Sequence, residues 1–292
     1  MGPKTLGALA AALLAGLLAA PAAGATGRPP VVPGSRYLAL GDSVTFGYQE
    51  PFVVPSPKYT DPGSFLAYPE QLGAELHLIV ANPACPGETS ASLIDARAES
   101  NGCENTLGAP TGYRRLWPLH VRYKGSQLAY AVRYLRAHRD VALVSLMIGA
   151  NDLFICQETT HDGCGSAPEQ AAAFAKIRRN VGKILSAIRN QAHYRGQLAI
   201  VNYYSLDYTF AFITGAVRAL NKAQDSAARP FHVEIGNGFR EFEAASLHFG
   251  GKPCQAGLLT LHMIGPPPTC GVHPSYAGQA LLAQALEKAI AL

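Results

Sequence analysis

The order of apolar and polar positions along the chain predicts strands and helices that alternate. Short apolar runs, typical of buried strands, occupy residues 37–40, 77–81, 141–148, 198–201 and 231–235. Between them, apolar residues recur at helical spacing in the ranges 65–76, 128–135, 166–188, 212–227 and 276–290. Strands that alternate with helices are typical of a parallel sheet with helices on both faces, so we expect an α/β fold.

The first apolar run ends in a polar motif. In the segment RYLALGDSVTFGY, residues 36–48, the run stops at Gly41, and Ser43 follows two positions later. A serine at the carboxyl end of a core strand, before a helix, lies where open α/β sheets bind their ligands. Gly-Asp-Ser also suits a polar turn with a capping serine. The motif alone therefore leaves both interpretations open.

Three further blocks follow the apolar runs. Gly87 comes after the second run, in NPACPGETS, and Asn151 comes directly after the third run, in GAND. His273 lies in a His-Pro pair near the C-terminus, before the last predicted helix. With the block around Ser43, these blocks make the chain resemble the SGNH (GDSL-type) hydrolase superfamily of secreted esterases and lipases. The resemblance covers nearly the whole chain beyond its N-terminal segment.

The resemblance implies a fold and an active site. The fold would be a flavodoxin-like three-layer sandwich around a central parallel five-stranded sheet, in the order 2-1-3-4-5. Ser43 would be the nucleophile and His273 the base, and the oxyanion hole would consist of Ser43, Gly87 and Asn151. In this strand order the switch point lies between the first and third strands, which Ser43 and Asn151 follow. We therefore expect both residues in one crevice.

One position departs from the family pattern. Many members carry an aspartate three residues before the histidine, and this chain has Cys270 there. The histidine still needs a partner for its second ring nitrogen, so that the correct tautomer faces the serine. We predict a Ser–His dyad in which a main-chain carbonyl near Cys270 orients His273. An acid from elsewhere, such as Asp207 after the fourth strand, is the alternative.

The N-terminal segment has the features of a signal peptide. Residues 1–25 contain Lys4, an apolar run rich in Ala, Leu and Gly, and the small-residue triplet 23–25. A retained transmembrane anchor is the alternative, because the run is long enough for one. We expect cleavage, a flexible leader over residues 26–34, and a single hydrolase domain over residues 35–292. The mature protein would then be secreted and would have no stable membrane span.

The chain contains six cysteines, which in an exported protein predict disulfide bonds. We expect the local pairs Cys85–Cys103, Cys156–Cys164 and Cys254–Cys270. Zinc binding is the alternative for any set of cysteines and histidines, but the spacings lack the close ligand pairs of structural zinc sites. We therefore expect neither a metal nor an organic cofactor.

Composition narrows the class of partner. The chain has 292 residues, of which 48% are hydrophobic and 15% charged, values that fit one large domain with a well-filled core. The net charge of +4 is small, and the basic residues are scattered, which argues against nucleic-acid binding. We expect a monomer that binds a small-molecule or lipid ester.

The leading hypothesis is a secreted serine hydrolase that cleaves carboxylic esters. Within that class the substrate stays open between lipase, esterase, phospholipase and carbohydrate deacetylase activities, because the four blocks leave the acyl and alcohol pockets to loops. A secreted binding protein that kept the fold without turnover is the alternative from another class. The missing aspartate is the feature that favours it.

Overall fold

The computed structural model describes residues 1–2 and 28–292. The predicted signal peptide, residues 1–25, falls almost wholly outside the described residues and stays a prediction. Over the part of the chain that is described, no helix is both long and apolar enough to cross a membrane. In the predicted leader, residues 26–34, the described residues other than Arg28 and Val31 are exposed, and the carbonyl of Pro29 accepts from Gln197 Nε2. Val31 is buried, and its N–H donates to the carbonyl of Ala291.

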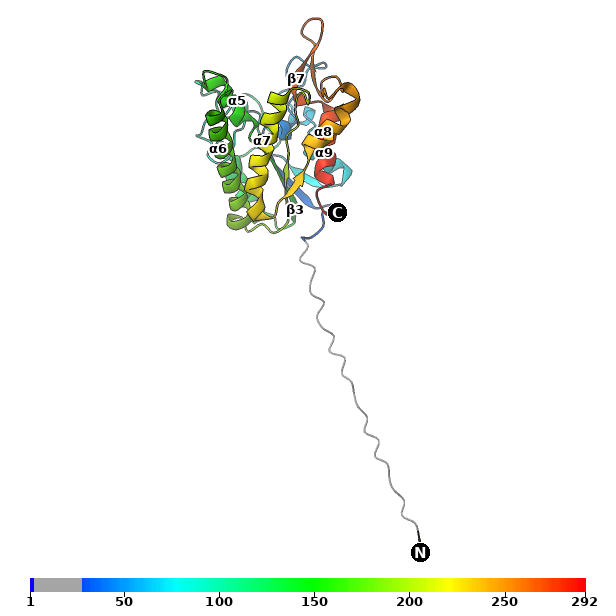
Figure 1. Cartoon of the computed structure of the whole chain (residues 1–292). Helices are drawn as coiled ribbons and strands as arrows, with labels where there is room; N and C mark the ends of the chain where they lie inside the picture. Colours follow the sequence, from blue (N-terminus) through cyan, green and yellow to red (C-terminus); the bar gives the residue numbers. More distant parts are fainter. Residues whose placement is uncertain (3–27) are drawn as a thin grey trace.

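Five parallel strands form the central sheet (Figure 1). They are β1 (Arg36–Gly41), β2 (Ile79–Ala81), β3 (Val141–Met147), β4 (Gln197–Val201) and β5 (Glu234–Gly236). The order is β2-β1-β3-β4-β5, so the predicted fold class and strand order are confirmed. Strands β2 and β5 begin later than predicted because His77 and His232 have positive φ angles, which form turns instead of extended backbone.

Helices cover both faces of the sheet. One face carries α4 (Gln127–Ala137), α6 (Ala167–Ser186) and α7 (Ala211–Ala228), and the other carries α2 (Tyr68–Glu75), α8 (Gly238–Ser246) and α9 (Tyr276–Glu287). Figure 1 shows α6 and α7 on one side of β3 and α8 and α9 on the other. Shorter turns are η1 (Pro62–Ser64), η2 (Ala187–Gln191), η3 (Arg229–Phe231) and η4 (Leu247–Phe249).

The helix with the clearest sequence pattern illustrates how these elements form. Helix α6 begins after Ser166, whose hydroxyl accepts from the N–H of Glu169 and so satisfies one free donor of the first turn. Its apolar face, with Ile177, Val181 and Ile184, is completely buried against the sheet and α7. Burial of an aliphatic side chain of this size contributes about 1.5–3 kcal/mol, which fixes the orientation of the helix.

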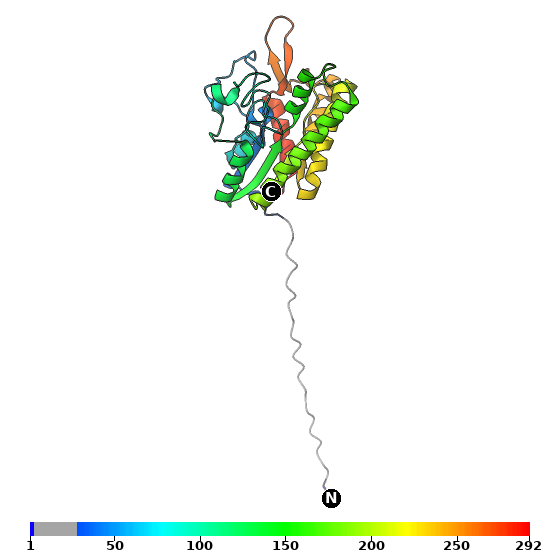
Figure 2. The same ribbon diagram turned by 90° about the vertical axis from the view of Figure 1, so that its left-hand side faces the viewer.

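Several helices and strands were not predicted from the sequence pattern. These are α1 (Ser43–Phe46), α3 (Tyr113–Leu116), α5 (Ala150–Thr159) and an antiparallel hairpin of β6 (Leu259–His262) and β7 (Thr269–Pro274). Residues 237–272 include α8 and most of the hairpin. The prolines at 266–268 lie in the turn of the hairpin, so they interrupt neither strand. Figures 1 and 2 show the hairpin projecting beyond the sheet.

Disulfide bonds join the cysteines as three local pairs, with Cα atoms 5.4–5.8 Å apart. The pairs are Cys85–Cys103, Cys156–Cys164 and Cys254–Cys270. Cys270 lies in β7, and its bridge attaches this strand to the segment before β6. The bridge therefore anchors β7 at a residue close to the turn of the hairpin, where Cys270 pairs with Leu261.

Candidate active site

Ser43 is the first residue of α1, directly beyond the carboxyl end of β1. Asp42 caps this helix, because its Oδ1 accepts from the N–H of Val44 at 3.0 Å. The other oxygen of Asp42 accepts from the Tyr203 hydroxyl. Burial raises the pKa of Asp42 to about 6, although these hydrogen bonds oppose the shift. The cap fixes the backbone that presents Ser43 at the sheet edge.

His273 reaches Ser43 from β7. Its Nε2 lies 2.9 Å from the Ser43 Oγ, a hydrogen-bonding distance. The ring of Tyr48 packs edge-on against the imidazole, with ring centroids 5.0 Å apart. The nucleophile and base that the resemblance implies are thus in contact, although 230 positions separate them in the sequence.

A carboxylate, and not a main-chain carbonyl, contacts the second nitrogen of His273. Glu50 Oε1 lies 2.7 Å from Nδ1, so an imidazole protonated at Nδ1 donates to Glu50 and leaves Nε2 free to accept from Ser43. Burial acts to raise the pKa of Glu50, but the hydrogen bond and charge of His273 outweigh it and lower the pKa to about 2. Glu50 therefore stays ionised at neutral pH.

The predicted dyad with a carbonyl near Cys270 is consequently wrong. Cys270 is bonded to Cys254, and the acid comes instead from the loop after α1. The alternative acid, Asp207, is also excluded from this role, because its carboxylate accepts from the backbone N–H and the hydroxyl of Thr209 at 2.8 and 2.6 Å.

Gly87 and Asn151 line one cavity together with Ser43, and Asn101 connects them. Asn101 donates from its backbone N–H to the Gly87 carbonyl at 2.7 Å and from its side-chain amide to Asn151 Oδ1 at 3.1 Å. Asn151 Nδ2 donates one hydrogen to the carbonyl of Glu88 at 3.0 Å, and no acceptor among residues 28–292 bonds its second hydrogen. Gly87 has a φ of +80°, and a Cβ there would lie 2.3 Å from the Asn101 carbonyl oxygen.

Two cavities, each of about 290 Å³, open onto Ser43. The first is lined by all four predicted site residues, together with Tyr48, Asn101 and Tyr113. The second extends between α5 and α7 and is mostly apolar. Its wall includes Leu153, Phe154, Phe212, Ile213, Val217 and Leu220. The nucleophile therefore lies between a polar-aromatic cavity and an apolar one.

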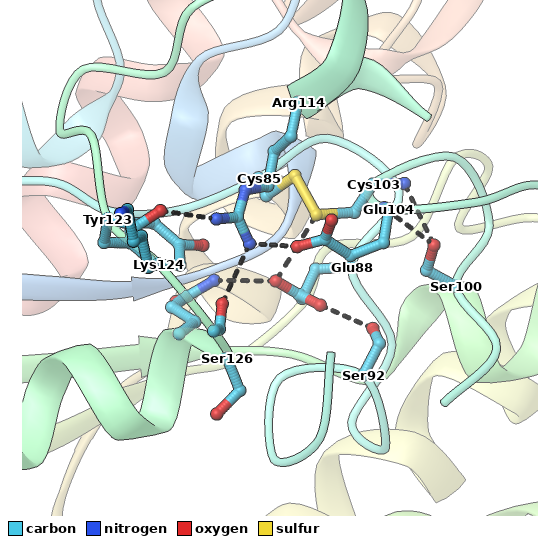
Figure 3. A network of polar contacts seen from close by, with 12 residues as sticks. Cys85, Glu88, Ser92, Ser100, Cys103, Glu104, Arg114, Tyr123, Lys124 and Ser126 are labelled. Carbon is cyan, nitrogen blue, oxygen red and sulfur yellow. Dashed lines mark hydrogen bonds and ion pairs between the residues drawn. A yellow bond between two sulfur atoms is a disulfide. The ribbon is translucent and has the colours of Figure 1, made fainter. Parts of the chain in front are cut away.

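A buried polar network supports the loop that carries Gly87 (Figure 3). Glu88 accepts from Ser92 and from Gln127, and the Gln127 side chain also bonds both backbone groups of Gly41. Burial raises the pKa of Glu88 to about 7. Cys85 and Cys103 lie close enough to Glu88 to form a metal site, but their sulfurs are bonded to each other and provide no thiolate.

Asp152 lies in the first turn of α5. Gly149 is the N-cap of α5, and the buried carboxylate of Asp152 accepts from the backbone N–H and the hydroxyl of Ser90 at 2.7 and 2.8 Å. Asp152 thereby ties α5 to the segment that follows Gly87. Neither Asn101 nor Glu50 was predicted, because both lie in irregular loops without a local motif.

Residues 39–281 match the model of the GDSL-like lipase/acylhydrolase family. The chain belongs to this family. Membership in the family places the protein among ester hydrolases. No curated protein sequence matches the chain.

Solved structures support the same fold. A phospholipase A1 from Streptomyces albidoflavus aligns over 88% of this chain and 99% of its own, with 18% identity and a TM-score of 0.56. An acetylxylan esterase from Geobacillus stearothermophilus aligns over 90% and 97%, with 14% identity and a TM-score of 0.54. At these identities the likeness concerns the fold alone.

Proposed function

We propose that this family member hydrolyses carboxylic esters through an acyl-enzyme, with Ser43 as nucleophile, His273 as base and Glu50 as the third member of a triad. The observation that carries the proposal is the continuous contact from Glu50 through His273 to Ser43, at 2.7 and 2.9 Å. A serine hydroxyl is a weak nucleophile until an adjacent base removes its proton, and this contact supplies that base.

The surrounding groups fit each step of the reaction. As Ser43 Oγ attacks the ester carbonyl, its proton passes to His273 Nε2, and the carboxylate of Glu50 stabilises the resulting imidazolium. The oxyanion would accept hydrogen bonds from the backbone N–H groups of Ser43 and Gly87 and from the free Asn151 amide hydrogen. Each such donor typically contributes about 10²–10³ in kcat. His273 then protonates the leaving alcohol, and water repeats the sequence on the acyl-enzyme.

The apolar cavity suggests which esters are used. A substrate whose acyl chain fills the space between α5 and α7 would remove apolar surface from water, at about 0.8 kcal/mol for each buried methylene. An acetyl group would leave most of this cavity empty. We therefore favour esters with longer acyl chains, as in a lipase or phospholipase, over acetylated sugars. The alcohol would lie on the side of Tyr48 and Tyr113.

We also propose that the protein acts outside the cell. Its disulfide bonds and the N-terminal pattern of residues 1–25 both support an oxidising, exported environment.

Labelling with a fluorophosphonate probe tests the proposed chemistry. The wild-type protein and the variant Ser56→Ala, which changes an exposed loop serine, should be labelled and should hydrolyse p-nitrophenyl esters. Ser43→Ala should show neither reaction while its thermal unfolding stays unchanged. A wild-type protein that is folded but unlabelled would favour the non-catalytic binding protein. Labelling that survives in Ser43→Ala would assign the nucleophile to another residue.

A further inference from the structure

The second oxygen of the Glu50 carboxylate, Oε2, faces the β6–β7 hairpin and not His273. His262 Nε2 lies 3.5 Å from Oε2, and the side chains of both residues are less than a fifth exposed. Thr260 lies two positions before His262 on β6, so the two side chains project from the same face of the strand. Glu50 is therefore enclosed between two histidines, His273 at Oε1 and His262 at Oε2.

Three polar atoms at this place lack a hydrogen bond of full geometry within the described residues. They are Glu50 Oε2, His262 Nε2 and Thr260 Oγ1, and all three are inaccessible to solvent. Buried polar groups without such bonds are uncommon in folded proteins, and each one calls for a structural or functional reason. Here the three atoms surround one carboxylate, so a shared role in holding that carboxylate provides the reason.

Gly271 also lies next to the Glu50 carboxylate, together with His273, His262 and Thr260. A Cβ at Gly271 would lie 2.3 Å from Glu50 Oε1, 2.4 Å from Thr260 Oγ1 and 2.6 Å from His262 Nε2. No side chain fits there while the carboxylate keeps its place. The strand that carries His273 thus leaves space for an acid that arrives from another part of the chain.

The loop that carries Glu50 is attached to the same hairpin next to these contacts. The backbone N–H of Met263 donates to the carbonyl of Phe52 at 3.0 Å. The ring of Phe52 also packs edge-on against His262, with centroids 5.9 Å apart. His262 consequently contacts both the carboxylate of Glu50 and the ring of Phe52, two positions further along the same loop.

We propose that His262, Thr260 and Gly271 form a receptor for the Glu50 carboxylate, in which His262 is a positioning residue that acts on Ser43 through Glu50 and His273. This proposal rests on the proposed function. A carboxylate held at one oxygen can still rotate about its last side-chain bond, whereas a donor at the second oxygen fixes its plane. The plane matters because a displacement of about 1 Å among reacting groups can reduce the rate about a hundredfold.

The test compares His262→Leu with His262→Gln. Leucine removes the ring nitrogen that faces Glu50 Oε2. We expect kcat to fall about 10–100-fold with KM nearly unchanged, because His262 lines neither of the cavities that open onto Ser43. The amide nitrogen of glutamine comes close to the position of Nε2, so His262→Gln should recover most of the activity. His248→Leu, which changes an exposed histidine, is the matched control and should behave as wild type. Thr260→Val keeps the side-chain shape and should reduce kcat about fivefold, even where His262→Leu does not fold.

A spectroscopic measurement separates positioning from simple stability. The proton on His273 Nδ1, observed by NMR in ¹⁵N-labelled protein, should shift or exchange faster in His262→Leu and keep its wild-type signature in His262→Gln. The proposal is overturned if leucine and glutamine variants match wild type in both kcat and this resonance, or if both lose activity only in proportion to melting temperature. A wild-type protein without esterase activity would overturn the proposed function alone, since the NMR comparison would still decide the role of His262.

Discussion

Replacement of Glu50 by glutamine should nearly abolish turnover. The substitution keeps the size of the side chain and removes its charge next to the base. In the attack step His273 becomes an imidazolium, and Glu50 Oε1 lies 2.7 Å from its Nδ1. A glutamine there offers either a neutral oxygen or a competing N–H donor, and the donor would favour the wrong tautomer.

The size of the effect follows from the contact. Two unit charges at 2.7 Å, in surroundings with an effective dielectric constant of about 20, attract each other by about 6 kcal/mol. Neutralising the aspartate of a serine-hydrolase triad lowers kcat about 10⁴-fold, which corresponds to about 5 kcal/mol. The two figures agree, so we expect a loss of about 10⁴ in kcat with little change in KM.

The assay is hydrolysis of p-nitrophenyl butyrate over a range of concentrations, with thermal unfolding measured on the same samples. Asp207→Asn is the control. It neutralises a carboxylate that is bonded to Thr209 and not to His273, so it should leave kcat unchanged. A folded Glu50→Gln variant that kept more than about a tenth of the wild-type kcat would refute the triad. It would restore the hypothesis that a main-chain group orients His273.

Two further predictions concern the cavity and the buried network. Ala216→Phe narrows the apolar cavity and should lower kcat/KM for octanoyl esters, by about fourfold for each methylene group that no longer fits. The kcat/KM for acetyl esters should stay unchanged, and an equal fall for both esters would contradict this assignment. Burial raises the pKa of Glu88 to about 7 from an ordinary 4.5, so the wild-type protein should lose stability as pH rises through this interval. The loss in the free energy of unfolding should be on the order of 3 kcal/mol between pH 4 and 8, and urea unfolding should show that Glu88→Gln lacks it. A difference in stability between variant and wild type that does not change with pH would contradict this prediction.

The sheet was predictable because its central strands are buried on both faces. The residues of β1, β3 and β4 from Tyr37, Leu143 and Leu198 onward are nearly all inaccessible, and such strands appear in the sequence as continuous apolar runs. Helix α5 left no comparable pattern. It starts three residues after β3 ends, and its buried positions Asn151, Asp152 and Ile155 are mostly polar. A helix that buries functional polar groups lacks the apolar face on which recognition depends.

The acid was not predictable from local sequence. A motif reports which side chains are close along the chain, and Glu50 is 223 positions from His273. It lies in the segment before the prolines at 51, 55 and 57, which only indicates a loop. The cysteine at position 270 correctly indicated that the usual acid is missing, but it carried no information about the replacement.

The origin of the acid changes what must be assembled to form the site. Ser43 and Glu50 belong to one short segment at the end of β1, and the histidine between them comes from the hairpin at the other end of the chain. The active geometry therefore depends on the contacts between these two segments, among them those of His273 with Ser43 and Glu50 and of His262 with Glu50. The Cys254–Cys270 bridge closes a short loop that contains β6 and the turn of this hairpin, and so reduces the conformations that the segment can sample when unfolded. A cysteine where many relatives carry the acid thus serves the same histidine by another route, because it anchors the strand on which that histidine meets Glu50.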